Sequence, residues 1–168
     1  MSFNNIPGSI CIGKAGLANG TTTTYTRGAA VTASIRGKAV ACAAASNTTT
    51  PTSDFVTGKT FVPIERGKGC VFVFGVTATD TVGAIQGEMV NLVPAGANVA
   101  DTAFADAPQF PAIPDNFCPI GYLWVRIGAD LVATSWTLGA AGSNLATLTG
   151  RASGFVDVVM LPDRPQTS

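Results

Sequence analysis

One apolar run without a polar break, Cys70–Val76, constrains the fold of this chain more than any other feature. Apart from the cysteine and one glycine, its residues are aromatic or β-branched, which is typical of a strand. Because neither alternate set of side chains is polar, both faces of this strand must be covered by protein. The run therefore predicts a strand buried on both faces, either between two sheets or between a sheet and a partner.

Glycine-containing turns predict hairpins on both sides of this run. Residues 29–35 and 38–45 are expected to pair through the two-residue turn Arg36-Gly37, because glycine adopts the positive φ that such turns require. After the run, a turn signal at residues 80–83 predicts a return strand at residues 84–93.

The rest of the chain completes a β-rich pattern. Residues 94–119 are an Ala- and Pro-rich connection, in which Asn98 caps a predicted short helix at residues 98–107. Further strands are predicted at residues 120–127, 134–138, 145–149 and 155–161. The predicted fold class is an all-β, single-domain β-sandwich or β-barrel-like core with an extended N-terminal arm and a long Pro/Ala-rich loop.

The expected organisation is an arm at residues 1–20, a β domain at residues 21–162 and a tail at residues 163–168. The arm is rich in Gly, Asn and Ser, and its isolated apolar residues cannot form a core alone, so a partner must order it. The predicted partner-binding residues are the apolar residues of the arm and the cations of the first hairpin: Phe3, Ile6, Ile10, Arg36 and Lys38.

Charge is scarce, at 12% of the residues, and this predicts a surface largely buried against other protein. The net charge of zero favours neither nucleic acid nor a membrane as a partner. Positions 1–70 nevertheless contain seven basic and two acidic residues, whereas positions 71–168 contain three basic and eight acidic residues. Either these two halves form opposite poles for ordered docking, or they interleave and their charges mix.

The four cysteines are far apart and form no Cys-x-x-Cys pair, so no metal site or cofactor is predicted. No segment resembles a targeting signal or a membrane span, and we expect the protein to be made in the cytoplasm. Free buried thiols are the expected state, with a disulfide framework as the weaker alternative.

The chain contains no histidine, which removes the usual general base and predicts that the protein is not an enzyme. The remaining catalytic alternatives are a Ser-Lys dyad and a carboxylate pair such as Asp101 with Asp106 or Asp157 with Asp163. Tyr122, Trp124 and Trp136 are expected in the core or an interface, with a sugar-stacking platform as the alternative.

Residues 111–126, which include Pro119-Ile120-Gly121-Tyr122, and residues 155–162 together resemble the P-x-P…P-I-G-Y-x-x-V…D-x-x-x-x-P ending of small tailed-phage virion proteins. The hairpin at residues 33–40 and the segment at residues 70–86 are similar to the earlier part of the same family. The first twenty residues have no counterpart.

This resemblance implies a capsid decoration, or cement, protein that assembles as a homotrimer on the phage head and binds the major capsid protein. Its location would be the capsid surface of the virion. The alternatives are a head-fibre or tail-adhesin module that binds host surface glycans and a virion-associated glycan hydrolase.

Overall fold

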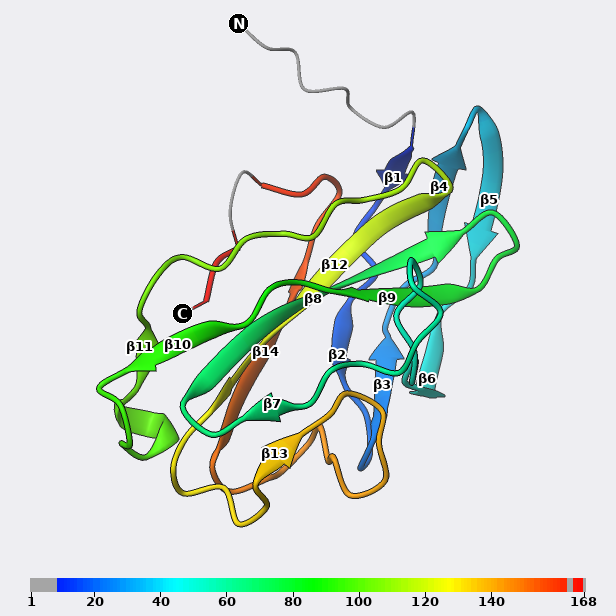
Figure 1. Ribbon diagram of the computed structural model, residues 1–168. Coiled ribbons are helices and arrows are strands. Elements are labelled where there is room, and N and C mark those ends of the chain that lie inside the picture. Colours follow the sequence, from blue (N-terminus) through cyan, green and yellow to red (C-terminus); the bar gives the residue numbers. More distant parts are fainter. Residues whose placement is uncertain (1–8, 163–164, 168) are drawn as a thin grey trace, which may run out of the picture.

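The computed structural model describes residues 9–162 and 165–167 (Figure 1). Curled antiparallel sheets form a half-barrel, which confirms the all-β, sandwich- or barrel-like class. No described residue is in an α-helix. The elements are β1 (Ile10–Ile12), β2 (Leu17–Asn19), β3 (Thr24–Arg27), β4 (Val31–Ile35), β5 (Lys38–Cys42), β6 (Ala45–Thr49), β7 (Ile64–Glu65), β8 (Lys68–Thr77), β9 (Val82–Gln86), β10 (Val90–Val93), the 3-10 helix η1 (Val99–Asp101), β11 (Ala103–Phe104), β12 (Phe117–Ile127), β13 (Ser135–Trp136) and β14 (Arg151–Asp157).

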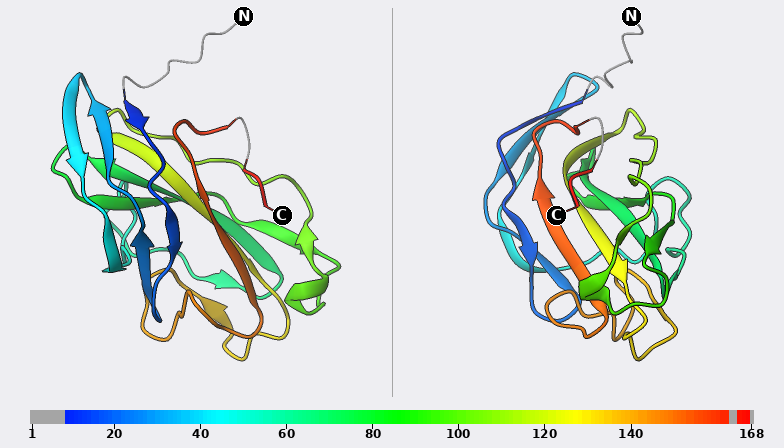
Figure 2. Two further views of the ribbon diagram at one scale, coloured as in Figure 1. Left: turned by 180° about the vertical axis from the view of Figure 1, so that it is seen from behind. Right: turned by 90° about the vertical axis from the view of Figure 1, so that its left-hand side faces the viewer.

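Strands β1 to β6 form an N-terminal layer of two three-stranded sheets, with strand orders β1-β4-β5 and β2-β3-β6. The two sheets continue into one another, because Ala29 N–H bonds the Ala15 carbonyl at 2.9 Å and Gly28 N–H bonds the Gly16 carbonyl at 3.0 Å. The predicted hairpin through Arg36-Gly37 is confirmed as β4 and β5. In Figure 2 this layer lies along one side of the molecule.

The apolar run forms β8, which is the central strand of a six-stranded sheet. Five of its strands have the order β11-β10-β8-β12-β14, and the sixth, β9, also pairs with β8. Strands β9 and β10 lie one after the other along one edge of β8, and β12 lies along its other edge. The return strand was therefore predicted in the right place but as one piece. The interruption lies at residues 87–89, directly after Gln86, whose side chain bonds both backbone groups of Val62 at 2.8 Å and 2.9 Å.

Both faces of β8 are buried by this chain itself. Phe72 and Phe74 point into the main core, which the large sheet shares with the N-terminal layer. Val71 and Val73 point the other way, into a second cluster with Tyr122, and Phe110, Ile113 and Leu161 pack against that cluster. The Pro-rich connection and the C-terminal segment thus bury the second face of β8, and burial of this face does not require a partner.

A β-bulge allows a proline in β12, an interior strand of the large sheet. Pro119 lies opposite Gly75 and Gly121 lies opposite Phe74, so Ile120 has no partner on β8. Pro119 costs no ladder bond to β14, because β14 begins to pair with β12 only at Gly121. The extra residue reverses the in-out alternation, and Cys118, Ile120 and Leu123 all point into the main core.

The predicted helix at residues 98–107 is wrong, because only the three-residue turn η1 forms there. The Asn98 side chain makes no capping bond. Instead, the Asp130 carboxylate accepts the Val99 N–H at 2.8 Å, and the Thr102 hydroxyl donates to the Val99 carbonyl at 2.8 Å. The next residues, Ala103 and Phe104, form β11 and pair with β10, so the chain is extended there and does not continue as a helix.

The strand predicted at residues 145–149 is also wrong. The Asn144 side chain accepts hydrogen bonds from the backbone N–H groups of Ala146 and Thr147, at 2.7 Å and 3.2 Å, and this Asx turn excludes extended pairing. The strand predicted at residues 134–138 is reduced to β13, which pairs with β7. The last strand occupies residues 151–157 in place of 155–161, because its register is set by pairing with β12.

Most of the expected arm belongs to the domain. Residues 10–19 contain β1 and β2, and Cys11, Ala15 and Leu17 are buried in the main core. The expectation that residues 1–20 lie outside the core is therefore wrong for residues 10–19. Isolated apolar residues suffice there because every second side chain of a paired strand faces inward.

The end of the chain folds back onto the large sheet. The Gln166 N–H donates to the Tyr122 hydroxyl at 2.6 Å, and this hydroxyl donates to the Gln166 carbonyl at 3.3 Å. Pro165 is buried. Residues 165–167 belong to no sheet, as the prolines of the tail predicted, and Gln166 is bonded to Tyr122 of the second cluster.

Candidate interaction surface

The outward side of the β1-β4-β5 sheet is an uncharged surface, which we call the N-terminal face. Strand register aligns its side chains in two cross-strand rows, which are Ile10, Ser34 and Ala39 in one row and Ile12, Thr32 and Ala41 in the other. Ile10 is 57% exposed and Ile12 is 67% exposed. Two β-branched apolar side chains therefore project from one short strand beside small neighbours on the adjacent strands.

The turn between β4 and β5 places two cations at one end of this sheet. Arg36 and Gly37 both have positive φ, 51° and 77°, which fits the twist of a two-residue hairpin turn. Ile35 pairs with Lys38, one position beyond the row that contains Ile10. Three of the predicted partner-binding residues, Ile10, Arg36 and Lys38, thus lie at the same end of one sheet.

The N-terminal layer carries positive charge and no carboxylate. Residues 9–50 contain four basic and no acidic residues. One of them is used internally, because the Arg27 guanidinium donates to the Tyr25 hydroxyl at 2.8 Å and to the Ala43 carbonyl at 3.2 Å. The other three, Lys14, Arg36 and Lys38, are exposed.

Within residues 9–162 and 165–167 the one ion pair joins Lys68 Nζ to a Glu65 carboxylate oxygen at 2.9 Å. It lies on β7 and β8, away from the N-terminal face. The exposed cations of the N-terminal layer are therefore free to meet carboxylates on a partner. An uncharged centre with a charged rim is the usual composition of a protein interface.

This surface could be identified from the sequence only in part. Phe3 and Ile6 lie outside the described residues. Ile12 was not selected, although it is more exposed than Ile10. The alternation Ile10-Cys11-Ile12 is the signal that identifies it, since a strand that buries Cys11 must project both isoleucines outward.

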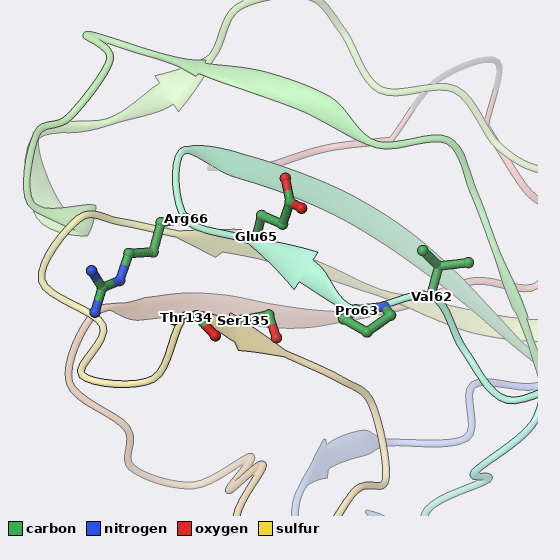
Figure 3. Close-up of a pocket in the computed structure, with 6 residues that line it drawn as sticks. All are labelled: Val62, Pro63, Glu65, Arg66, Thr134 and Ser135. Carbon is green, nitrogen blue, oxygen red and sulfur yellow. The ribbon is translucent and has the colours of Figure 1, made fainter.

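A hollow between β7 and β13 is lined by Val62, Pro63, Glu65, Arg66, Thr134 and Ser135 (Figure 3). The Arg66 guanidinium donates to the carbonyls of Val132 and Ala133, at 2.9 Å and 3.1 Å, and so joins the two sides of this hollow. The pKa of Glu65 is below its usual value because Lys68 donates a hydrogen bond to its carboxylate and its positive charge stabilises the ionised form. The two charged side chains of the hollow, Arg66 and Glu65, are therefore already bonded to neighbouring groups.

The three aromatic residues considered for sugar binding are divided between the two clusters, with Trp136 in the main core and Tyr122 and Trp124 in the second cluster. Trp136 and Tyr122 are buried, at 2% and 0% exposure. Trp124 is half-buried, and the Arg126 guanidinium lies 5.3 Å from its ring centroid. Asp163, which was paired with Asp157 as a catalytic alternative, lies outside the described residues. The Asp157 carboxylate accepts the Leu17 N–H at 2.8 Å, which fastens β2 to the end of β14.

No group of three or more His, Cys, Asp or Glu side chains in the described part of the chain is arranged to hold a metal ion. In the same part of the chain, no helix has the length and apolarity needed to cross a membrane. No protein-family model matches the sequence, and searches of curated proteins and of solved structures also find no match.

Proposed function

We propose that this protein is a capsid decoration (cement) protein of a tailed bacteriophage, which binds the outside of the head and bridges neighbouring major capsid subunits. The observation that carries the proposal is the N-terminal face, where exposed Ile10 and Ile12 project from the sheet whose β4–β5 turn contains the exposed cations Arg36 and Lys38. The likeness to tailed-phage virion proteins at residues 111–126 and 155–162 supports the same assignment.

The physical task of such a protein requires binding and no chemistry. Genome packaging loads a capsid from within, and a bridge between subunits stabilises it through buried apolar area, at roughly 25 cal/mol per Å². The preformed β1-β4-β5 sheet suits this role because its side chains need little ordering on binding. Residues 1–8 precede β1 in the sequence, and we include Phe3 and Ile6 in the proposed contact.

Substitution of Ile12 by aspartate is expected to weaken binding to the head about 30–100-fold. The change removes an apolar contact of about 1.5–3 kcal/mol and places a carboxylate in an uncharged interface, and each 1.4 kcal/mol is tenfold in affinity. Binding is measured by co-sedimentation with heads of the encoding phage that were assembled without this protein, and bound protein is quantified by mass spectrometry.

The matched control is Val132→Asp, because Val132 is 89% exposed and does not belong to the N-terminal face. This variant should bind like the wild type, and circular dichroism should show that both variants are folded. A chain that lacks residues 1–8 tests the contribution of Phe3 and Ile6. Equal binding by Ile12→Asp and Val132→Asp would overturn the assigned face. Failure of the wild type to bind heads, or selective binding to host glycans, would overturn the cement function in favour of an adhesin.

We also propose that the protein is a homotrimer, since cyclic assembly lets one surface repeat around the symmetry axes of a capsid. Light scattering of the purified chain at micromolar concentration is expected to give three times the mass of one chain, 17.0 kDa. A monomer mass both in solution and, after cross-linking, on the virion would contradict the trimer.

A further inference from the structure

Two cysteines from distant parts of the sequence lie in the main core, on two strands that contact each other. Cys11 is the central residue of β1, and Cys118 is the second residue of β12, and each is 1% exposed. Strand β1 lies beside the start of β12, and the Ser9 hydroxyl donates to the Asp115 carbonyl at 3.1 Å at the entry to both strands. The two cysteines belong to the same set of packed core residues.

The two thiols influence each other's ionisation. The neighbouring Cys118 thiol lowers the pKa of Cys11, and the neighbouring Cys11 thiol raises the pKa of Cys118. In the reduced protein each thiol donates to a backbone carbonyl, Cys11 to that of Gly13 at 3.4 Å and Cys118 to that of Pro119 at 3.9 Å. The other two cysteines have different surroundings. The Cys70 thiol donates to the Gly87 carbonyl at 3.2 Å, and burial raises its pKa to about 12. Burial also raises the pKa of Cys42.

We propose that Cys11 and Cys118 are a latent disulfide, which remains reduced in a reducing cytoplasm and closes when the protein meets a small-molecule disulfide such as oxidised glutathione. The Cys11 thiolate attacks one sulfur of the oxidant and releases one glutathione thiolate. Cys118 then loses its proton, attacks the Cys11 sulfur of the mixed disulfide and releases the second glutathione thiolate. Two protein thiols are oxidised, one glutathione disulfide is reduced, and the two protons end on the two released thiolates.

Strand β1 provides the access that this exchange requires. It has only three residues and pairs with β4 alone, so it opens locally at lower free energy than the central strands. Once formed, the bond would hold β1 against the large sheet and so fix the strand that presents Ile10 and Ile12. The chemistry does not depend on the proposed function, whereas this consequence for docking does.

The experiment incubates the full-length protein with oxidised glutathione, then denatures and alkylates it without reductant. Before oxidation, four alkylated cysteines are expected, and after oxidation only Cys42 and Cys70. Trypsin and a glutamyl endoprotease, which cuts after Glu88, place Cys11, Cys42, Cys70 and Cys118 on separate peptides, so the linked pair is identified by mass. The melting temperature should rise by about 6–15 °C on oxidation, because the bond closes a long loop.

Two variants make the result decisive. Cys42→Ala should still form the bond, and Cys118→Ala should retain glutathione on Cys11 with no rise in melting temperature. A Cys11–Cys42 link, a stable glutathione adduct on wild-type Cys11, or four free thiols after the β1 amides have exchanged with deuterium would each overturn the proposal. None of these outcomes depends on binding to phage heads, so this proposal and the cement function fail separately.

Discussion

Replacement of Phe72 by alanine is expected to lower the free energy of unfolding by about 3–5 kcal/mol, the usual cost of truncating a buried phenylalanine. Phe72 lies at the centre of β8 with no exposed surface. Its ring packs edge-on against Phe61 and Trp136, with centroid distances of 5.3 Å and 6.2 Å. Backbone hydrogen bonds hold both neighbours of β8 in place, so the cavity cannot close by a simple shift of the strand.

Urea unfolding followed by tryptophan fluorescence measures this change. Phe110→Ala is the matched control, because Phe110 is half-buried and packs on the second cluster from an irregular segment. Its loss should cost about 1–2 kcal/mol, since the segment can relax into the space. Equal destabilisation by the two substitutions would contradict the assignment of β8 as the structural centre.

Replacement of Gly150 by alanine is expected to cost about 3 kcal/mol. Gly150 has a φ of 81°, which disfavours any residue with a Cβ by about 1 kcal/mol. Its added Cβ would also overlap the backbone nitrogen and Cα of Leu131, and overpacking of this kind costs a further 1–3 kcal/mol or so. Gly150 also accepts a hydrogen bond from the Gly128 N–H at 2.9 Å, so the displaced backbone lies directly beside β12 and β14.

The matched control is Gly142→Ala, which isolates the steric part of this cost. Gly142 has the same φ of 81°, but no atom lies within 4 Å of its added Cβ. This variant should lose only about 1 kcal/mol. Thermal unfolding of both variants measures the difference, and a cost at Gly142 equal to that at Gly150 would show that backbone strain alone, without the contact to Leu131, explains the effect.

The candidate site could be predicted only in part. Ile10, Arg36 and Lys38 were selectable by residue type, since exposed apolar and cationic residues in an arm and a turn indicate a partner. That these three lie at one end of one sheet depends on the pairing of β1 with β4, which joins segments more than twenty positions apart. The placement of Cys11 near Cys118 depends in the same way on where β1 lies against β12.

Local sequence determined the features in which short-range chemistry has no strong competitor. The apolar run at residues 70–76 specified a strand buried on both faces, and Arg36-Gly37 specified a hairpin turn, because backbone φ and side-chain alternation are set within a few residues. The all-β class follows from the same patterns.

Tertiary structure decided the rest, because long-range contacts can outweigh local preferences of about 1 kcal/mol. The Asp130 carboxylate and pairing with β10 prevented a helix after Asn98. The bulge at Ile120 allowed Pro119 into a central strand. Burial of Cys11 and Leu17 made most of the expected arm part of the core. The sequence alone thus determined the central strand and its turns, whereas the layers that cover this strand, and hence the face left exposed, depend on contacts that form only in the folded chain.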